Sequence, residues 1–270
     1  MMECLIIKKW VDLDPGIGTR VAAEIIGCTM FHFIGSVAPT AVANAVALMV
    51  IVYFTAKQSG AHINPAISLT FTLLGHTNPI EFIIYSISQI IGCIFGAFIL
   101  KGLVPKSFQN TINGCFVPQE SLSYLQIWGW ETVGTAMFIM PVFSVVWYMQ
   151  NKTGYGTTGP IMIGLSLLAS AYAAGPWTGA SFNPSRTLAS PIVLHCVDWH
   201  YVWIYILGEL MGAMVATTFI LPWYGIATKA WYRGMLSKDF RIKMAKYVPN
   251  IVINTLDMYI PANIEAEHDV

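Results

Sequence analysis

Two short segments of the chain place the same polar residue types at the same spacing. The first covers residues 59–66 and ends in Asn64-Pro65-Ala66, and the second covers residues 178–185 and ends in Asn183-Pro184-Ser185. Each begins with a hydroxyl residue, Gly and Ala, and Asn-Pro follows at a fixed step. Proline is favoured in the first turn of a helix and Asn is a good N-cap, so each segment predicts a helix start. The Asn amides can donate hydrogen bonds to water or to an alcohol.

The surroundings of both segments are apolar. Of the 270 residues, 56% are hydrophobic and only 10% are charged, whereas soluble domains carry about 25% charged residues. Most of the protein surface is therefore expected to face lipid. The formal net charge is zero, so no overall field attracts nucleic acid and no nucleic-acid partner is expected.

The apolar segments fall into two length classes. A helix needs about 20 mainly apolar residues to cross a bilayer, and six segments qualify: residues 20–39, 41–57, 79–104, 127–149, 159–177 and 201–224. The segments at 64–74 and 183–194 are too short to cross, which is typical of re-entrant half-helices. The sequence therefore predicts an all-α membrane protein in which three spans and a half-helix occur twice.

Basic residues set the orientation, because cytoplasmic loops carry an excess of Lys and Arg. With both termini in the cytoplasm, all but three of the 14 Lys and Arg residues fall inside, the exceptions being Lys101, Lys106 and Arg186. An odd number of spans separates the two Asn-Pro segments, so the half-helices enter from opposite faces. The two halves form an inverted repeat of an integral, multi-pass protein.

Half-helices entering from opposite faces would meet tip to tip near the middle of the bilayer. Each N-terminus carries roughly half a positive charge, and Asn64 and Asn183 would point their amides into the gap. A neutral molecule accepts these hydrogen bonds, whereas a cation meets two positive ends and loses its hydration shell. The paired segments therefore predict a passive path for water and small uncharged solutes.

Further residues repeat between the halves and complete a family pattern. Glu24 and Glu131 are each followed by Gly three residues later and then by Met-Phe, and Arg186 follows the second Asn-Pro box. In combination these motifs resemble the aquaporins, the major intrinsic proteins, over nearly all of residues 20–224. Ser185 replaces the usual Ala of the second box, a small-for-small exchange that should leave the tip geometry intact.

The resemblance implies a fold, an assembly and a division of the chain. It implies a right-handed bundle of six spans with two half-helices, and a homotetramer in the lipid bilayer with one pore per subunit. No cofactor, metal or enzyme activity is expected. The expected divisions are a cytoplasmic N-terminus at 1–19, an aquaporin-like channel domain at 20–227 with repeats at about 20–104 and 127–224, and a cytoplasmic tail at 228–270.

The resemblance also places Arg186 in an outer selectivity filter, together with Asn44, Ala171 and Ala180. Water-specific relatives commonly carry an aromatic residue at the first of these positions and His at the second, and neither is present here. A register slip of one residue would bring in Tyr172, and Asn44 would alternatively serve an interhelical hydrogen bond. As aligned, the small polar ring predicts passage of glycerol-sized solutes as well as water.

Other features favour narrower functions. Thr187 follows Arg186 where glycerol-conducting relatives usually carry Asp, which is typical of a water channel. The alternatives are therefore a strictly water-selective channel and a junctional or scaffolding protein of the same fold with little conduction. A proton-coupled transporter or enzyme built on the buried acids would need a nucleophile or metal ligands facing them, and the sequence offers no such cluster.

The remaining polar residues take roles from the resemblance. Glu24 and Glu131 are expected to accept backbone hydrogen bonds from the re-entrant loops and to hold irregular backbone inside the bundle. His62 would line the pore at the cytoplasmic mouth. Glu209 stands where the family usually has Pro, and either loop contacts or a subunit interface would explain it.

The five cysteines, Cys4, Cys28, Cys93, Cys115 and Cys196, are odd in number and scattered. This pattern argues against a disulfide framework and favours small apolar packing residues. Ala180 occupies the position where mercurial-sensitive relatives carry Cys. Mercurial block should therefore be weak unless Cys196 reaches the outer mouth.

Overall fold

The computed structural model describes residues 16–37, 40–105, 115–150 and 156–223, and every regular element in those ranges is helical. The helices are α2 (Ile17–Val37), α3 (Ala41–Ser59), α4 (Pro65–Leu73), α5 (Pro79–Leu103), α6 (Tyr124–Gln150), η2 (Gly156–Thr158), α7 (Gly159–Thr178), α8 (Pro184–Leu194) and α9 (Trp199–Trp223). Most of the expected N-terminal segment, the whole expected tail at 228–270, Cys4 and Lys106 lie outside the described residues.

Six of these helices are long and apolar enough to cross a membrane: α2, α3, α5, α6, α7 and α9. The two segments predicted as half-helices are α4 and α8, of 9 and 11 residues. The predicted fold class is therefore confirmed. The boundaries differ by a few residues, since the first span begins at Ile17 and the fourth at Tyr124.

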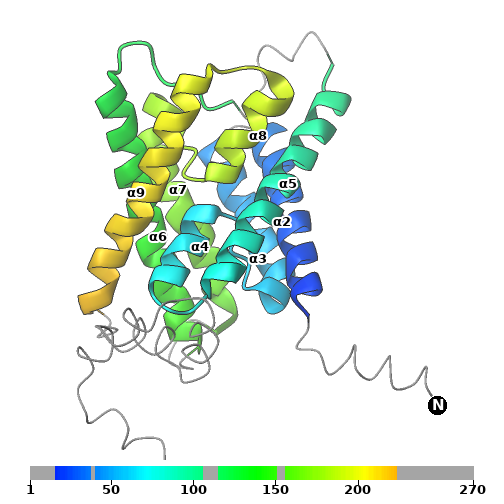
Figure 1. The fold of residues 1–270 in the computed structure, drawn as a ribbon, viewed down its shortest axis with the longest axis vertical. Coiled ribbons are helices and arrows are strands. Elements are labelled where there is room, and N and C mark those ends of the chain that lie inside the picture. The colour runs from blue at the N-terminus through cyan, green and yellow to red at the C-terminus, as the bar shows by residue number, and fades with distance from the viewer. Residues whose placement is uncertain (1–15, 38–39, 106–114, 151–155, 224–270) are drawn as a thin grey trace, which may run out of the picture.

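The helices pack as two equivalent halves. Helix α2 packs on α5 and α3, α6 packs on α9 and α7, and α3 meets α7 where the halves join. In Figure 1, α4 occupies the lower half of the bundle and α8 the upper half, while α2 begins and α9 ends at the lower end. The two half-helices thus enter from opposite ends.

Small residues bring the principal helix pairs together. A Cβ atom on Gly92 of α5 would lie 2.4 Å from the carbonyl oxygen of Ile25 on α2. In the second half, a Cβ on Gly212 of α9 would lie 2.6 Å from the carbonyl oxygen of Thr132 on α6. Both contacts are closer than real Cβ atoms allow, so glycine is required at these crossings, as in other membrane helix pairs.

Gly92→Leu is expected to destabilise the bundle strongly. The added side chain must push α2 and α5 apart, and overpacking of this kind costs about 1–3 kcal/mol. Thermal unfolding of the detergent-solubilised protein, followed by tryptophan fluorescence, measures the effect. Gly102→Leu is the matched control, because it lies on the same helix and a Cβ there meets nothing within 4 Å. Equal melting temperatures for the two variants would contradict the close α2–α5 contact.

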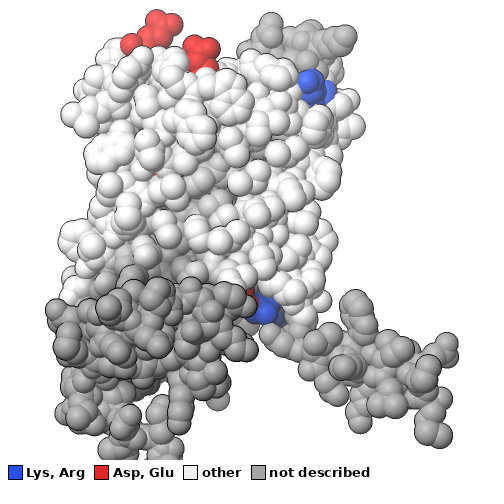
Figure 2. Space-filling model, in the orientation of Figure 1, with Lys and Arg blue, Asp and Glu red and all other residues white. Residues whose placement is uncertain are grey.

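The outer surface of the bundle suits a bilayer. Large apolar side chains are exposed around it, including Phe54, Ile80, Phe98, Leu103 and Phe219. Figure 2 shows nearly all coloured, charged atoms at the two ends of the described part, with an uncharged band between them. The charged residues at membrane depth, Glu24, Glu131, Arg186 and Glu209, are buried inside the bundle.

The cysteines require a correction. Cys115 and Cys196 form a disulfide with a Cα–Cα distance of 6.0 Å, whereas Cys28 and Cys93 are free and buried. The expectation of small apolar packing residues agrees with Cys28 and Cys93, but for Cys115 and Cys196 it was wrong, because it considered only the number and scatter of cysteines along the sequence. The α5–α6 and α8–α9 connections meet at the same end of the bundle (Figure 1), which brings together two residues 81 positions apart.

Candidate functional site

Asn64 and Asn183 form the tips of the two half-helices. The Asn64 Oδ1 atom accepts a hydrogen bond from the Ala66 N–H at 2.8 Å, and the Asn183 Oδ1 atom accepts one from the Ser185 N–H at 3.1 Å. Pro65 and Pro184 begin α4 and α8 directly after these N-caps. The side chain of Ser185 adds a bond, since its hydroxyl donates to Asn183 Oδ1 at 2.7 Å.

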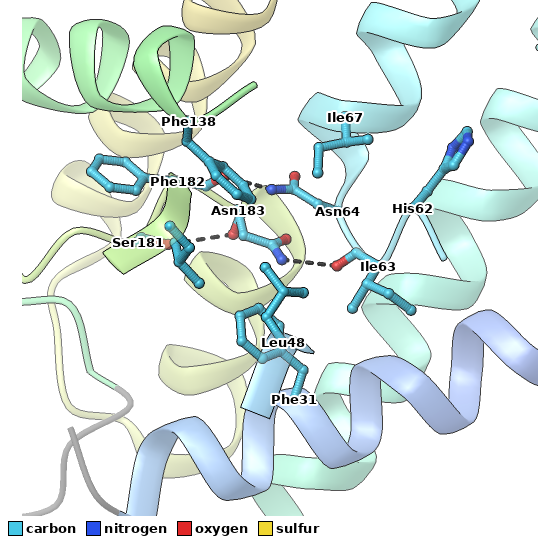
Figure 3. A pocket seen from close by; sticks show the side chains of 11 residues that line it. Phe31, Leu48, His62, Ile63, Asn64, Ile67, Phe138, Ser181, Phe182 and Asn183 are labelled. Carbon is cyan, nitrogen blue, oxygen red and sulfur yellow. Dashed lines mark hydrogen bonds between the residues drawn. The ribbon is translucent and has the colours of Figure 1, made fainter. Parts of the chain in front are cut away.

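The two tips are joined by reciprocal hydrogen bonds. The Asn64 Nδ2 group donates to the carbonyl oxygen of Phe182 at 2.7 Å, and the Asn183 Nδ2 group donates to the carbonyl oxygen of Ile63 at 2.9 Å (Figure 3). Each amide therefore bonds to the loop of the other half. This arrangement fixes the separation of the two helix N-termini.

A small cavity lies beside the tips. It has a volume of about 10 Å³, and its walls include both Asn side chains and the apolar side chains of Phe31, Leu48 and Phe138 (Figure 3). About 10–15 Å³ on this measure is the minimum that holds one water molecule. The cavity at the tips is therefore about the size of one water molecule, and its walls contain both Asn side chains and apolar side chains.

The loops leading to the tips have unusual backbone conformations. Ala61 and Ile63 in the first loop have φ angles of 52° and 53°, and Ala180 and Phe182 in the second have 54° and 52°. Non-glycine residues rarely adopt this left-handed region, and a β-branched residue such as Ile63 is a true outlier there. Such conformations persist only where their surroundings hold them.

Buried acids hold these loops. The Glu24 carboxyl accepts hydrogen bonds from the N–H groups of His62 at 3.0 Å and Ile63 at 2.7 Å, from Ser59 Oγ at 2.6 Å and from Gln89 Nε2 at 2.7 Å. In the second half, the Glu131 carboxyl accepts from the N–H of Phe182 at 3.0 Å and from Thr178 Oγ1 at 2.6 Å. Both acids thus bind the strained backbone directly.

The glycine that follows each acid makes room for the loop. A Cβ on Gly27 would lie 2.4 Å from the Ile63 side chain, and one on Gly134 would lie 2.2 Å from the Phe182 ring. The repeated Glu-x-x-Gly pattern therefore has a physical basis. The acid binds the loop backbone, and the glycine one turn later accommodates the loop side chain.

Glu209 completes the support of the second tip. Its carboxyl accepts hydrogen bonds from the Asn183 N–H at 3.0 Å and from Thr187 Oγ1 at 2.7 Å, and the residue is fully buried. Of the two explanations left open by the sequence, the structure shows the loop contact. Gln89 occupies the corresponding place in the first half, where it binds Glu24.

Two tyrosines support the loops and were not recognised in the sequence. The Tyr85 hydroxyl donates to the carbonyl oxygen of Ser59 at 2.9 Å, and the Tyr205 hydroxyl donates to the carbonyl oxygen of Thr178 at 2.7 Å. Each Tyr comes four residues before Gln89 or Glu209. This shared spacing in the third and sixth spans is the sequence pattern from which the two tyrosines could have been predicted.

Two of the four expected filter residues, Arg186 and Asn44, are in contact. The Arg186 guanidinium donates to Asn44 Oδ1 at 2.8 Å and is only 3% exposed, and Ala171 and Ala180 are also buried. Asn44 additionally makes the interhelical bond that was the alternative, since its Nδ2 donates to the Gly35 carbonyl oxygen at 3.1 Å. Tyr172, which a register slip of one residue would bring in, is 63% exposed, whereas Ala171 is buried.

Two aromatic residues flank Arg186, and both were missed as filter candidates. The guanidinium carbon lies 4.5 Å from the centre of the Phe31 ring and 5.2 Å from that of Phe116. Phe31 had a signal, because the Met-Phe pair of α2 recurs with Phe138 in α6. Phe116 lies in the connection between α5 and α6 and has no counterpart in a motif.

His62 lies between two cavities. Its Nδ1 atom is 3.0 Å from Ser68 Oγ. Its ring packs against those of Phe71 and Tyr85, with distances of 5.0 and 5.2 Å between ring centroids. Besides the small cavity, His62 lines a second cavity of about 150 Å³. His76, which was not recognised in the sequence, lines this larger cavity as well. The larger cavity lies on the side where α4 ends.

Comparison with known proteins identifies the family. The model of the family described as "Major intrinsic protein" matches residues 16–220. The chain belongs to the major intrinsic protein family. As a member, it is an integral multi-pass membrane protein of a channel family, whose proteins are transporters rather than enzymes.

Several named proteins resemble this major intrinsic protein. "Aquaporin-8" of Notomys alexis is 32% identical over 204 residues, which cover 71% of this chain and 76% of that protein. "Aquaporin TIP2-3" of Arabidopsis thaliana is 31% identical over 235 residues, covering 84% and 86%. The X-ray structure of the aquaglyceroporin from Plasmodium falciparum matches with a TM-score of 0.71 at 20% identity, covering 78% of this chain and all of that one, which supports the fold.

Mercurial reagents are expected to inhibit this family member weakly. A thiol reacts with mercury only where it is accessible as a thiolate. Among the described cysteines, Cys115 and Cys196 form a disulfide, and Cys28 and Cys93 are buried. Mercuric chloride should therefore lower water permeability of reconstituted vesicles by less than about twofold. Ala180→Cys is the positive control and should create sensitivity, because Ala180 occupies the position where the resemblance places the Cys of mercurial-sensitive relatives. Strong inhibition of the unmodified protein that persists in a Cys4→Ser variant would contradict this prediction.

Proposed function

We propose that the chain is a passive channel for water and small uncharged solutes such as glycerol, and that it excludes ions and protons. The observation that carries this proposal is the pair of Asn-capped helix tips, joined by reciprocal hydrogen bonds beside a cavity that fits one water molecule. Two helix N-termini directed at one point disfavour a cation there.

The proposed path has three parts. Arg186 and Asn44, with Ala171 and Ala180, form an outer filter; Asn64 and Asn183 form the centre; and His62 opens to the larger cavity of about 150 Å³ at the inner mouth. Glu24 and Glu131 act as supports of the re-entrant loops rather than as proton carriers, because their oxygens accept hydrogen bonds from loop N–H groups.

The small side chains of Ala171 and Ala180 in the proposed filter support the inclusion of glycerol. Thr187 favours strict water selectivity instead, because glycerol-conducting relatives usually carry Asp at this position, and here the Thr187 hydroxyl donates to the Glu209 carboxyl at 2.7 Å. Strict water selectivity is the second candidate, favoured by the two rings that flank Arg186.

The placement in the membrane belongs to the same proposal. We assign both termini to the cytoplasm, because Arg20 and Lys57 lie at the end where α2 begins, whereas Lys101 lies at the other end. The channel domain spans residues 20–227, and the family membership supports a homotetramer with one path per subunit. Water, small neutral solutes and the lipid bilayer are the expected partners.

Stopped-flow light scattering of reconstituted vesicles tests the function. Vesicles are challenged in turn with sucrose, glycerol and urea, and empty vesicles provide the baseline. We expect fast shrinkage in sucrose, and in glycerol a fast shrinkage followed by reswelling. Water flux without reswelling in glycerol would establish the strictly water-selective alternative. Shrinkage no faster than that of empty vesicles would exclude conduction and favour the junctional or scaffolding alternative.

A further inference from the structure

The Arg186 guanidinium is held between rings from two different parts of the chain. Phe31 belongs to the spanning helix α2, whereas Phe116 belongs to the connection between α5 and α6. A guanidinium within about 6 Å of a ring centroid is attracted to the ring face, and both distances meet this limit. Phe116 therefore contacts a filter residue from outside the bundle.

The Phe116 ring also lies against the second re-entrant loop. A Cβ atom on Gly179 would be 3.5 Å from the Phe116 Cδ1 atom, which is ordinary contact distance. Gly179 directly precedes the filter residue Ala180. The ring thus adjoins Arg186 and the loop residue that precedes Ala180, and it supplies an aromatic group that Asn44 and Ala171 do not.

Two attachments fix the position of Phe116. The preceding residue, Cys115, is joined by the disulfide to Cys196, just beyond the end of α8. The second attachment is at Gln119, three residues after Phe116, where the Gln119 N–H donates to the carbonyl oxygen of Trp177 at 2.8 Å. The first attachment connects Phe116 to the half-helix that carries Arg186, and the second connects it to α7, which leads to Ala180.

We propose that Phe116 is a specificity-determining residue of the outer filter and that the Cys115–Cys196 disulfide positions it there. The inference rests on the proposed channel function and extends it to the upper size limit for solutes. With the disulfide intact, the ring restricts the space beside Arg186 and Ala180. With the disulfide reduced, the connection keeps its attachment at Gln119 but the ring is released from the filter, and larger polyols enter.

The test compares the entry of water, glycerol and erythritol into reconstituted vesicles of wild type, Phe116→Ala and the double variant Cys115→Ser/Cys196→Ser. Val117→Ala is the matched control, because Val117 is the next residue of the same connection and is 56% exposed. Wild type is also measured after treatment with a water-soluble phosphine. The phosphine is oxidised to its oxide with oxygen from water, and the disulfide becomes two thiols.

The expected result is a rise in the ratio of erythritol to water permeability by about tenfold in Phe116→Ala, the scale on which sites discriminate molecules that differ by one carbon unit. The double variant and phosphine-treated wild type should show a similar rise. Untreated Val117→Ala should match untreated wild type, and phosphine should leave the ratio of Phe116→Ala unchanged because that variant has no ring to release. The phosphine arm remains informative even where the double variant fails to fold.

Two results would overturn the inference. A ratio in Phe116→Ala equal to that of Val117→Ala would remove Phe116 from the filter. A shifted ratio in Phe116→Ala without any shift after reduction, which a non-reducing gel verifies, would remove the positioning role of the disulfide. Wild-type vesicles that conduct no more water than empty vesicles would instead refute the proposed channel function. This outcome differs from both results that overturn the role of Phe116.

Discussion

Asn64→Asp is expected to lower the water permeability of reconstituted vesicles by about tenfold or more. Asp caps a helix as well as Asn does, so α4 keeps its start. The amide donor, however, becomes an oxygen that faces the carbonyl oxygen of Phe182, now 2.7 Å from Asn64 Nδ2. Loss of a buried donor costs about 1–3 kcal/mol, and this cost falls on the contact that joins the two tips.

Asn78→Asp is the matched control for this prediction. Asn78 is also an N-cap, whose Oδ1 accepts from the Glu81 N–H at 2.9 Å, but it is exposed at the start of α5 and does not line the small cavity. Its variant should conduct within about twofold of wild type, since the cap is preserved. Stopped-flow rates are normalised to the amount of protein per vesicle. If Asn64→Asp conducts like Asn78→Asp, the amide donors do not determine conduction.

Glu24→Gln is expected to prevent accumulation of folded protein. The Glu24 carboxyl accepts four hydrogen bonds, two of them from loop N–H groups, and an amide would direct its own N–H groups at these donors. Each buried donor that loses its partner costs about 1–3 kcal/mol. The left-handed backbone at Ile63 would lose its support as well. Yield and size-exclusion profile in detergent measure the outcome.

Glu81→Gln serves as the control for the loss of an acid. Glu81 pairs with Arg20 at 2.9 Å near the end of the bundle, where both side chains are partly exposed. Surface ion pairs contribute only about 0–1 kcal/mol, so this variant should purify as wild type does. Glu131→Gln should behave like Glu24→Gln, because Glu131 holds the second loop in the same way. A monodisperse, thermally stable Glu24→Gln protein would contradict the role of the acids.

The half-helices and their supporting acids could be predicted from sequence because they occur twice. One Asn-Pro pair between apolar runs is consistent with an ordinary helix start, but two pairs in equivalent places are typical of a membrane path. The same comparison related Glu24 to Glu131. It also contained the signals for Phe31 and Tyr85, whose counterparts are Phe138 and Tyr205.

The surroundings of Arg186 could be predicted only in part. The resemblance named Asn44, Ala171 and Ala180 as its partners in a filter, and the structure shows a hydrogen bond between Arg186 and Asn44. Phe116 and the disulfide beside it lie in connections, which share no periodicity and no repeat. Their contact depends on how the α5–α6 and α8–α9 connections meet in space, and neither connection alone carries that information.

Water and proton movement, measured in the same vesicles, test the proposed selectivity of the helix tips. The joined helix tips are proposed to pass neutral molecules and to reject positive charge. Vesicles that contain a pH-sensitive dye are mixed first with sucrose and then with acid, beside protein-free vesicles. We expect water permeability about tenfold or more above that of protein-free vesicles, and a rate of proton entry equal to that of protein-free vesicles. Proton entry that rises in proportion to water permeability would contradict the exclusion of protons by the paired helix tips.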